Sequence, residues 1–494
     1  MNTPLRLGIA GLGTVGIGVV KIVQMHADML TRRAGRPVEI VAVSASSRSK
    51  QRSADISSYG WEDDPVALAR RDDIDVVLEL IGGENGTAKA LVETALANGK
   101  DVVTANKALL AHHGQALALA AEEAGQVLRF EAAVAGGIPV IKALTEGLAG
   151  NRIGRVMGVM NGTCNYILTR MEATGQGYNV LFDECARLGY LEADPNLDVG
   201  GIDAGHKLSL LSAIAFGAQV DFSSVELQGI TDISLDDIRL ARDMGFAIKL
   251  LGVTQMTGRG LEQRMTPCLV PESHPLGQLD GGTNMVVIEG DSVGQIVLRG
   301  AGAGEGPTAS AVMSDVIDIA RGLRLPTFGE PAIGMKRVPA AVVSAAAPWY
   351  LRMTLLDKPG ALAKIATASP EDLRDRISDT ALWPVALWGQ RKPIPVLGDI
   401  RLAMRQEKAV TIDYEDEHGR PTSRTIWPVG LAFYEGKQTI AAWCLLRQDF
   451  RNFRTDRIVC LTITEERYGK RRAVLEREWR QSWDQDRRTH EREG

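Results

Sequence analysis

The feature that most constrains the fold is a glycine-rich turn between a strand and a helix at the start of the chain. The apolar run 5–10 ends at Gly11-Leu12-Gly13-Thr14-Val15-Gly16, and residues 17–23 have helical spacing. Glycines here let the backbone approach a pyrophosphate, which then lies at the positive end of the helix. A Gly-x-Gly-x-x-Gly motif in this context predicts a dinucleotide-binding domain. The predicted cofactor contacts are Gly11, Gly13, Thr14, Val15 and Gly16.

Strands and helices alternate through the next hundred residues. Residues 38–43, 75–81 and 101–104 are predicted strands, and a helix is expected over 87–98. This order indicates a doubly wound parallel sheet. Lys107 lies just past the carboxyl end of the strand 101–104, where such sheets bind ligands. We therefore expect Lys107 to face a substrate or a cofactor.

The end of the second strand bears on the choice of cofactor. A site for NAD(H) usually has an acidic residue there, but residues 44–50 carry hydroxyls and the cations Arg48 and Lys50 instead. Such groups suit a 2′-phosphate, so NADP(H) is the preferred cofactor, with Arg48 as a contact and NAD(H) as a second possibility. The alternative is that Arg48 and Lys50 belong to a solvated loop.

Length and composition exclude several classes of protein. A chain of 494 residues suggests about three domains, and its net charge of -5 gives no argument for nucleic acid as a main partner. No apolar segment is long enough for a membrane span, and the N-terminus has no signal-peptide pattern, so we expect a cytoplasmic protein without a membrane partner. The five cysteines are scattered, which predicts neither a disulfide nor a zinc site.

An acidic and a basic residue in the middle of the chain have the spacing of one helix turn. Asp203 and Lys207 stand four apart at the start of an apolar run, so on a helix they share a face. Seen alone, such a pair is most often a capped, solvent-facing ion pair that contributes little.

The surrounding motif favours a functional interpretation. Gly-Tyr-x-Glu-x-Asp-Pro at 189–195, followed by Gly-x-Asp-x-x-x-Lys at 201–207, resembles the substrate-site signature of homoserine dehydrogenase. The resemblance extends in order from about residue 4 to about residue 366. It implies NAD(P)H-dependent, reversible reduction of L-aspartate 4-semialdehyde to L-homoserine in threonine, methionine and isoleucine biosynthesis. It also implies a homodimer formed through the middle domain.

The resemblance assigns roles to individual residues. Lys207 would donate to the carbonyl oxygen of the substrate with Lys107 assisting, Asp203 would orient the substrate or Lys207, and Glu192 would hold the substrate amino group. An ammonium group acts as an acid more readily when burial lowers its pKa. A second glycine-rich loop at 299–308, which includes Gly304, would close against the nicotinamide half of the cofactor.

Two further segments are interpreted through the family. The loop 131–139 would bind a monovalent cation, usually Na⁺, although its spacing alone predicts only a turn. Residues 156–166 match a strand and loop beside the substrate, in which Asn161, Thr163 and Asn165 could alternatively satisfy one another as a polar turn. The cation ligands carried over by position are Glu131, Val134, Gly136 and Ile138.

The C-terminal part departs from this family. Residues 349–366 resemble the beginning of an ACT regulatory domain, and the likeness stops near Thr367. Residues 394–468 resemble the ligand-sensing WYL domain of bacterial transcriptional regulators, with the namesake triplet replaced by Gln438-Thr439-Ile440. Arginines interleaved with aromatics at 447–457 could bind a nucleotide or a single-stranded nucleic acid, or could form an ion-paired sheet face. From Glu465 onward we expect a charged helix.

The expected organisation is a doubly wound α/β domain, an α+β catalytic domain and a small, mostly β C-terminal module. The boundaries are 1–130 for the NAD(P)-binding domain, 131–322 for the catalytic and dimerisation domain, 323–368 for a return segment with the truncated ACT start, and 369–494 for the WYL-like module and tail. Two alternatives stay open. One is a dehydrogenase for another amino-acid semialdehyde, and the other is a ligand-sensing regulator whose dehydrogenase half is inactive.

Overall fold

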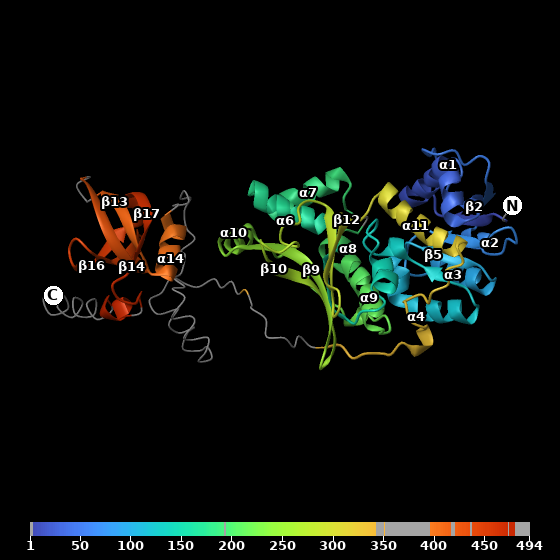
Figure 1. The fold of residues 1–494 in the computed structure, drawn as a ribbon. Coiled ribbons are helices and arrows are strands. Elements are labelled where there is room, and N and C mark those ends of the chain that lie inside the picture. Colours follow the sequence, from blue (N-terminus) through green and yellow to red (C-terminus); the bar gives the residue numbers. More distant parts are fainter. Residues whose placement is uncertain are drawn as a thin grey trace. The chain divides into compact units, whose positions relative to one another are not determined.

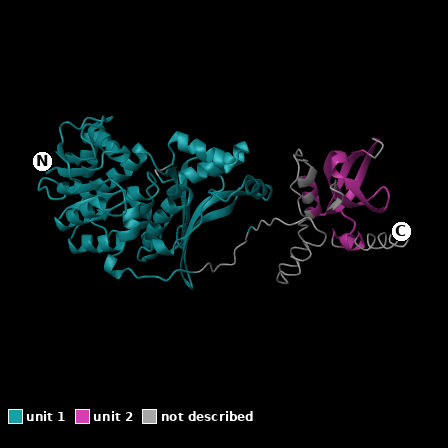
Figure 2. Cartoon of the chain, turned by 180° about the vertical axis from the view of Figure 1, so that it is seen from behind, with its two compact units in different colours: residues 1–350 teal, residues 351–494 magenta. Residues whose placement is uncertain are grey.

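The computed structural model describes residues 3–191, 194–341, 350, 396–415, 420–434, 437–472 and 474–479. The chain divides into two compact units, residues 1–350 and residues 351–494, which Figure 2 shows in different colours.

A parallel sheet of six strands forms the first part of unit 1. Its strand order is β3-β2-β1-β4-β5-β6, with β1 and β4 at the centre. The strands are β1 (Leu5–Ala10), β2 (Val38–Ser44), β3 (Gly60–Glu62), β4 (Val76–Glu79), β5 (Asp101–Thr104) and β6 (Leu128–Arg129). The helices between them are α1 (Thr14–Ala34), α2 (Pro65–Leu68), α3 (Thr87–Ala97) and α4 (Lys107–Glu123). The predicted doubly wound sheet is therefore confirmed.

A helix from much later in the chain completes this domain. Helix α11 (Glu305–Ala320) packs along α1, and Figure 1 shows the two side by side. The contact is close: a Cβ added at Gly18 would lie 2.7 Å from the carbonyl oxygen of Glu305. The Nζ of Lys21 also lies 2.7 Å from Oε1 of Glu305. The chain thus returns to the glycine-rich turn after it has built the second sheet.

The second sheet of unit 1 is mixed, with the order β12-β11-β7-β9-β10-β8. Its neighbours pair antiparallel except β8 and β10. The strands are β7 (Ile153–Val159), β8 (Glu226–Leu227), β9 (Phe246–Thr257), β10 (Gly260–Pro271), β11 (Thr283–Gly290) and β12 (Gly294–Ala301). The helices are α5 (Val140–Lys142), α6 (Gly162–Thr174), α7 (Tyr178–Leu188), α8 (Pro195–Val199), α9 (Ile202–Phe216) and α10 (Leu235–Asp243). Short turns of other helix types are η1 (Glu131–Ala133), η2 (Ala143–Gly147), η3 (Phe222–Ser224) and η4 (Ala332–Gly334).

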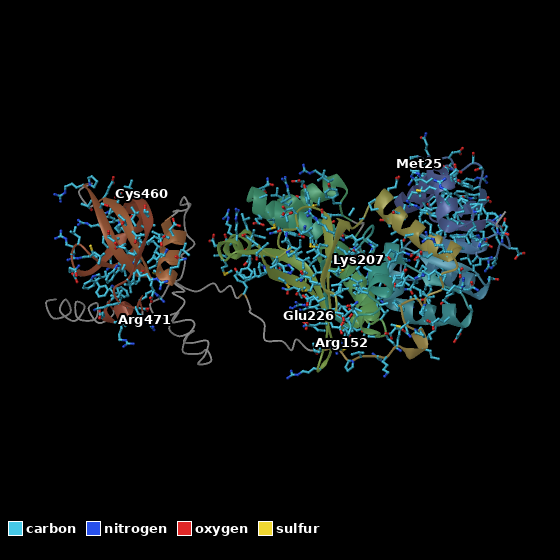
Figure 3. The ribbon with its side chains drawn as sticks, viewed as in Figure 1. Met25, Arg152, Lys207, Glu226, Cys460 and Arg471 are labelled. Atoms are coloured by element: carbon cyan, nitrogen blue, oxygen red, sulfur yellow. The ribbon has the colours of Figure 1, made fainter. Side chains whose placement is uncertain are left out.

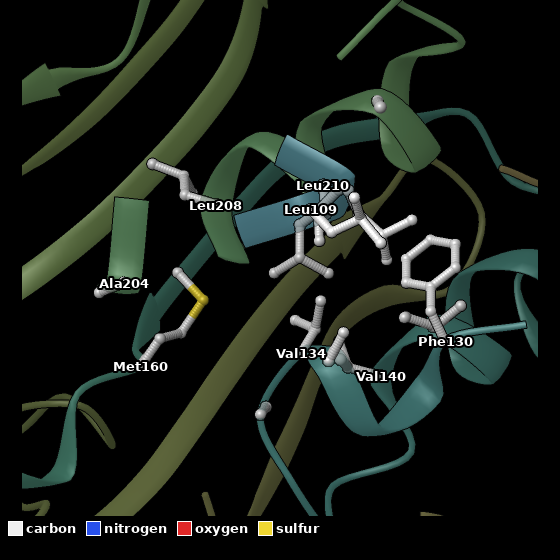
Figure 4. Close-up of a cluster of buried hydrophobic side chains, with 14 of the residues drawn as sticks. Leu109, Phe130, Val134, Val140, Met160, Ala204, Leu208 and Leu210 are labelled. Carbon is white, nitrogen blue, oxygen red and sulfur yellow. The ribbon is translucent and has the colours of Figure 1, made fainter. Parts of the chain in front are cut away.

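One hydrophobic core joins the two sheets of unit 1. It includes Leu109 of α4, Phe130 after β6, Met160 after β7 and Leu208 of α9, which Figure 4 shows in one cluster. Because such interiors are close-packed, helices α4 and α9 are fixed against each other. The two helices carry Lys107 and Lys207 respectively, so this packing positions the candidate site.

Two predictions within unit 1 were wrong in detail. In the segment 156–166 the strand is present as the end of β7, but the expected loop is helical, because α6 begins at Gly162. The second glycine-rich loop is shorter than 299–308, since β12 extends to Ala301 and α11 begins at Glu305.

The second unit contains an antiparallel sheet with the order β16-β15-β14-β13-β17. Helix α14 packs against it through Ile400 and Ala403, which lie in a core with Val410, Ile426 and Ile440. The elements are α14 (Val396–Gln406), β13 (Lys408–Glu415), β14 (Pro421–Tyr434), β15 (Lys437–Cys444), β16 (Asp449–Arg454), η5 (Thr455–Arg457) and β17 (Ile458–Arg467). The predicted small, mostly β module is confirmed.

The structure favours one of the two interpretations of the arginine and aromatic residues in this module. Phe453 is buried in the core and cannot stack on a base. Arg451 lies 3.4 Å from Asp449, and Arg454 pairs with Asp456 at 2.5 Å. These residues form an ion-paired sheet face, so a nucleic-acid or nucleotide ligand gains no support.

Of two predictions for the C-terminal part of the chain, the charged helix was wrong in its start and the ACT-like segment is not tested. The charged helix does not begin at Glu465, because β17 continues to Arg467 and helix follows over 474–479. The ACT-like start at 349–366 lies outside the described residues apart from Tyr350, whose hydroxyl donates to Oδ1 of Asp237 at 2.9 Å.

Within the described ranges, every helix is too short or too polar to cross a bilayer. In the same ranges, no three His, Cys, Asp or Glu side chains gather as metal ligands would. All five cysteines are free.

Candidate functional site

Asp203 lies between two lysines that come from different helices. Its Oδ1 is 2.7 Å from Nζ of Lys107, and its Oδ2 is 2.6 Å from Nζ of Lys207. The shared face of Asp203 and Lys207 is as predicted, but the pair is not solvent-facing, because Asp203 is 6% and Lys207 9% exposed. Figure 3 shows Lys207 where the two sheets of unit 1 approach each other. We call these three residues the Asp203 cluster.

Local sequence explains why the three side chains meet. Lys107 is the first residue of α4, and the Asn106 side chain caps that helix by accepting from the backbone N–H of Leu109 at 3.0 Å. Asp203 stands in the first turn of α9, which follows Gly201 in a left-handed conformation at φ 78°. Both helices therefore begin at the cluster.

The charge balance of the cluster follows from its burial. Burial alone would raise the pKa of Asp203, but the charges of Lys207 and Lys107 outweigh it and hold that pKa well below its usual range. Lys207 also donates to the carbonyl oxygen of Met160 at 2.9 Å. An ammonium group has three hydrogens, and these two bonds are all that Lys207 makes to the described residues. One hydrogen of Lys207 is therefore not engaged by any described residue.

His206 lies beside the cluster on α9. Its ring packs on Phe222, with 4.3 Å between the centroids, and on His112 of α4 at 5.5 Å. Burial lowers the pKa of His206 to about 4, although the Asp203 carboxylate acts in the opposite direction. The imidazole is therefore neutral near pH 7 and does not compete with the lysines for Asp203.

This burial predicts a pH dependence of stability. In the unfolded chain His206 takes up a proton below pH about 6.5, and in the folded protein only below about 4. The unfolded state thus binds more protons between these values, so the free energy of unfolding falls by about 2 kcal/mol from pH 7 to pH 5 and levels off below 4. Urea unfolding at pH 7 and pH 5 measures this loss of stability, and the part due to His206 should be missing in His206→Gln. His26→Gln, which replaces an exposed histidine, is the control and should behave like the native protein. An equal loss in the native protein and in His206→Gln would contradict this expectation.

The third predicted member of the substrate site lies outside the described residues. This is Glu192, three positions before α8 begins at Pro195. Tyr190, two residues earlier, is held from α6, because the hydroxyl of Thr163 donates to its carbonyl oxygen at 3.0 Å. The ring of Tyr166 also packs edge-on against the Tyr190 ring, with 5.4 Å between the centroids.

The polar residues at the start of α6 do not satisfy one another, as the polar-turn alternative required. Asn161 is the N-cap of α6, and its Oδ1 accepts from the N–H of Cys164 at 2.8 Å. Asn165 donates to the carbonyl oxygens of Leu279 at 3.1 Å and Gly281 at 2.7 Å. Asn161 thus caps α6, and Asn165 connects that helix to the segment 279–281.

The first glycine turn has the geometry expected of a pyrophosphate site. Gly11 has φ 101°, and a Cβ there would collide with the carbonyl group of Leu80. A Cβ on Gly16 would collide with the carbonyl oxygen of Gly11. A Cβ on Gly13 would meet no protein atom within 4 Å, so that position is free of protein contacts and open to a ligand.

The three glycines should therefore respond differently to alanine. Gly16→Ala is expected to lower the free energy of unfolding by about 2 kcal/mol or more, because a backbone carbonyl must move. Gly13→Ala is expected to keep its stability but to bind NADPH at least about 10-fold more weakly, since the methyl group stands where a pyrophosphate approaches. Urea unfolding and NADPH fluorescence titration measure the two effects. Unchanged NADPH affinity in Gly13→Ala would show that the pyrophosphate does not approach this turn.

The loop after β2 holds two arginines over one aromatic ring. Arg48 is exposed, with its guanidinium carbon 5.8 Å from the ring centre of Trp61, and Arg52 lies at 5.7 Å. Arg52 also donates to the carbonyl oxygens of Ser47 at 2.6 Å and Lys50 at 2.9 Å, which shapes the loop. Sequence reasoning identified Arg48 and missed Arg52. Arg52 belongs to the same short run of hydroxyls and cations, which could have revealed it.

The predicted cation loop is built around a buried carboxylate. Glu131 accepts from the backbone N–H groups of Ile141 at 3.0 Å and Lys142 at 2.8 Å, at the start of α5. Burial, and then the neighbouring Asp315, raise the pKa of Glu131 to about 7. Lys142 lies 3.5 Å from Asp315 and forms a short ion pair with Asp318.

The backbone of this loop is unusual beside Glu131. Ala135 and Gly136 both have φ 56°, so two consecutive residues are left-handed. The carbonyl oxygens of Val134 and Gly136 accept no hydrogen bond from the described residues, whereas that of Ile138 accepts from Val140 at 2.8 Å. The loop thus offers carbonyl oxygens and a carboxylate, which are the donors a hard cation prefers.

The chain matches known families over most of its length. Residues 11–131 match the family model "Homoserine dehydrogenase, NAD binding domain", residues 139–317 match "Homoserine dehydrogenase", and residues 395–463 match "WYL domain". A homoserine dehydrogenase of Neisseria gonorrhoeae is 45% identical over 370 residues, which are 74% of this chain and 85% of that protein. A homoserine dehydrogenase of Bacillus subtilis is 38% identical over 372 residues, with coverage of 74% and 85%.

Solved structures agree with the sequence matches. A homoserine dehydrogenase from Thiobacillus denitrificans superimposes with a TM-score of 0.66 at 42% identity, over 68% of this chain and 79% of that one. A hyperthermophilic archaeal homoserine dehydrogenase mutant in complex with NADPH gives a TM-score of 0.55 at 25% identity, over 64% of this chain and 97% of that one.

Proposed function

The chain belongs to the homoserine dehydrogenase family and is an oxidoreductase that interconverts L-aspartate 4-semialdehyde and L-homoserine; we propose that this reaction takes place at the Asp203 cluster. The observation that carries the proposal is the buried carboxylate of Asp203 between the ammonium groups of Lys107 and Lys207. The two alternatives were a dehydrogenase for another amino-acid semialdehyde and a regulator with an inactive dehydrogenase half. Neither gains support, since the matched relatives carry the name homoserine dehydrogenase.

Lys207 is the proton donor in this proposal. When bound, the nicotinamide cofactor supplies the hydride that reduces the aldehyde carbon. Lys207 directs its remaining N–H at the aldehyde oxygen, stabilises the negative charge that builds there, and gives its proton to form the hydroxyl of homoserine. The contacts with Asp203 and Met160 fix the ammonium group before the substrate arrives, so little reorganisation is needed during the reaction.

The neighbouring groups have supporting roles. Asp203 orients Lys207 and Lys107 at once, because each of its two oxygens faces one ammonium group. Lys107 is the more exposed lysine, with 28% of its side chain accessible, and contacts the substrate or the nicotinamide. Glu192, which lies outside the described residues, holds the substrate amino group in this proposal, as the resemblance implies. We assign the pathway as the branch that leads to threonine, methionine and isoleucine.

We assign NADP(H) as the preferred cofactor, with NAD(H) as the weaker one. The support is the pair of cations Arg48 and Arg52 at the end of β2, together with the absence of a carboxylate at residues 44–50. At the other end of the cofactor, Gly304 contributes a left-handed backbone with φ 116° at the start of α11.

The experiment that tests the function is homoserine-dependent reduction of NADP⁺ by the purified full-length protein. NAD⁺ is compared at equal concentration, and other amino alcohols serve as competing substrates. We expect activity with homoserine and a higher kcat/KM for NADP⁺. Absence of homoserine-dependent reduction with either cofactor would reject the assigned reaction, and a higher kcat/KM for NAD⁺ would reject only the cofactor preference.

We further propose that Glu131, Val134, Gly136 and Ile138 hold a monovalent cation such as Na⁺. The support is the set of hard oxygen donors, with two carbonyl oxygens that have no other partner in the described residues. The cation would fix the backbone between the two domains of unit 1. Na⁺ should therefore raise both Tm and kcat relative to choline at equal ionic strength, and Glu131→Gln should abolish both effects. Equal responses to Na⁺ and choline in the native chain would contradict the cation site.

A homodimer is proposed through the mixed sheet. Its support is the family resemblance, together with two exposed apolar side chains on that sheet, Met256 of β9 and Val297 of β12. Analytical ultracentrifugation of the full chain tests this assembly.

A further inference from the structure

The loop between β4 and α3 is an exposed glycine loop that needs outside support. All five residues from Gly82 to Gly86 are exposed. Gly82, Gly83 and Gly86 have φ values of 88°, 90° and 67°, which glycine adopts without strain but which leave the free loop many other conformations. We call this segment the glycine loop 82–86.

The start of the loop is held by a buried carboxylate at the end of β4. Oε1 of Glu79 accepts from the N–H groups of Ile81 at 2.9 Å and Gly82 at 3.1 Å. Oε2 of Glu79 accepts from the hydroxyl of Thr104 at 2.6 Å, which ties β4 to β5. Nδ2 of Asn106 then donates to the carbonyl oxygen of Gly83 at 2.7 Å.

The middle of the loop is held by two consecutive histidines of α4. His113 and Asn85 form a hydrogen bond between Nε2 and Oδ1 at 2.8 Å. Nε2 of His112 lies 3.1 Å from Oε2 of Glu84. Adjacent residues of the helix thus contact adjacent residues of the loop, and we call these two contacts the histidine clamp.

The same helix carries the lysine of the candidate site. Lys107 is one and a half turns before His112 on α4, and it contacts Asp203. The His112 ring also packs against His206 and Phe222, at 5.5 Å between centroids in both cases. His112 therefore contacts both the glycine loop and α9, next to Lys207.

The sheet places this loop between two parts of the cofactor site. In the strand order, β4 lies between β1, which leads into the first glycine turn, and β5, which leads to Lys107. Gly11 packs directly on the backbone at Leu80, just before the loop. A ligand that extends from the pyrophosphate turn toward Lys107 must pass the glycine loop at the carboxyl end of β4.

We infer that His112 and His113 are positioning residues that hold the glycine loop 82–86, through Glu84 and Asn85, in the shape that receives the nicotinamide half of the cofactor. The inference rests on the proposed site for the dinucleotide and adds two residues that do not touch the reacting atoms. Without the clamp the loop must be ordered when the cofactor binds, and this ordering weakens binding.

The test uses the full chain and two pairs of variants. His113→Ala and Asn85→Ala are each expected to raise the dissociation constant for NADPH about 3-fold, as lost hydrogen bonds do. Their double variant should be no worse than either single variant, because both remove the same contact. His112→Ala with His113→Ala should weaken NADPH binding about 10-fold and raise the KM for NADP⁺ more than it lowers kcat. The ratio of NADP⁺ to NAD⁺ affinity should stay unchanged, since the adenosine end is untouched.

The control is His26→Ala on the exposed face of α1, which should leave NADPH binding unchanged. Asn85→Ala and Glu84→Gln lie on the exposed loop itself, so they test the clamp even if the histidine variants lose stability. Native NADPH affinity in Asn85→Ala and in the histidine pair would overturn the inference, as would additive effects of His113→Ala and Asn85→Ala. NADPH binding is measured by fluorescence without homoserine, so an error in the assigned substrate would not obscure the result.

Discussion

Replacement of Lys207 by methionine is expected to lower kcat by about 10³-fold, the size of effect that a proton donor facing a developing oxyanion contributes. Methionine keeps much of the length of the side chain but has no proton to donate. Asp203 keeps Lys107 as its partner at 2.7 Å, so no unpaired carboxylate is left in the interior. The fold should survive, and NADPH should bind as in the native chain. Steady-state kinetics with homoserine, with NADPH fluorescence titration alongside, measures both.

A second variant at residue 207 separates proton donation from positive charge, and a variant on α3 is the control. Lys207→Arg keeps the positive charge but not the compact ammonium geometry, so kcat should stay at least about 10²-fold low. Lys89→Met, on the exposed side of α3, removes a lysine that pairs only loosely with Glu93 at 3.8 Å and should leave kcat unchanged. If Lys207→Met retained more than a tenth of the native kcat, another group would have to supply the proton.

The parallel sheet could be predicted because its signals are local. The strand β5 occupies Asp101–Thr104 as expected, since an apolar pair is bounded by polar residues that end the run on both sides. The turn at Gly11–Gly16 was also predictable, because each glycine has its own reason: a positive φ at Gly11 and a close backbone contact at Gly16. Such steric rules act over a few residues.

The start of α6 shows where local signals fail. Asn161 is a good N-cap residue, but Thr163 and Asn165 in the first turn also favour a polar turn. The outcome depends on distant partners: Asn165 donates to carbonyl oxygens near residue 280, and Thr163 donates to Tyr190. No window of sequence contains those acceptors.

The candidate site was predictable in its members but not in its environment. A spacing of four predicted that Asp203 and Lys207 share a helix face. It could not reveal that α9 is buried on all sides from Asp203 to Ala213, because burial depends on how two domains pack around that helix. The same packing hides His206, Met160 and the histidine clamp from any pattern search, since each acts through a partner on another element.

The burial of Asp203 leads to the second large effect. Asp203→Asn should lower kcat by about 10²-fold or more and the free energy of unfolding by about 3 kcal/mol. The variant keeps the shape of the side chain but leaves two ammonium groups close together around a neutral amide. Their repulsion should also shift the alkaline limb of the pH profile of kcat/KM to lower pH, because proton loss from one of them is favoured. Urea unfolding and pH-rate profiles measure these effects.

A second substitution distinguishes charge balance from simple loss of packing. If the cost of Asp203→Asn is uncompensated charge, then adding Lys107→Met should restore part of the stability, because only one buried ammonium remains. Recovery of kcat should be smaller, since Lys107 itself faces the site. If Asp203 acts only by filling space, Lys107→Met should add its own cost and the double variant should be less stable than Asp203→Asn. The sign of the coupling free energy therefore decides whether Asp203 acts as the shared counter-ion of the two lysines.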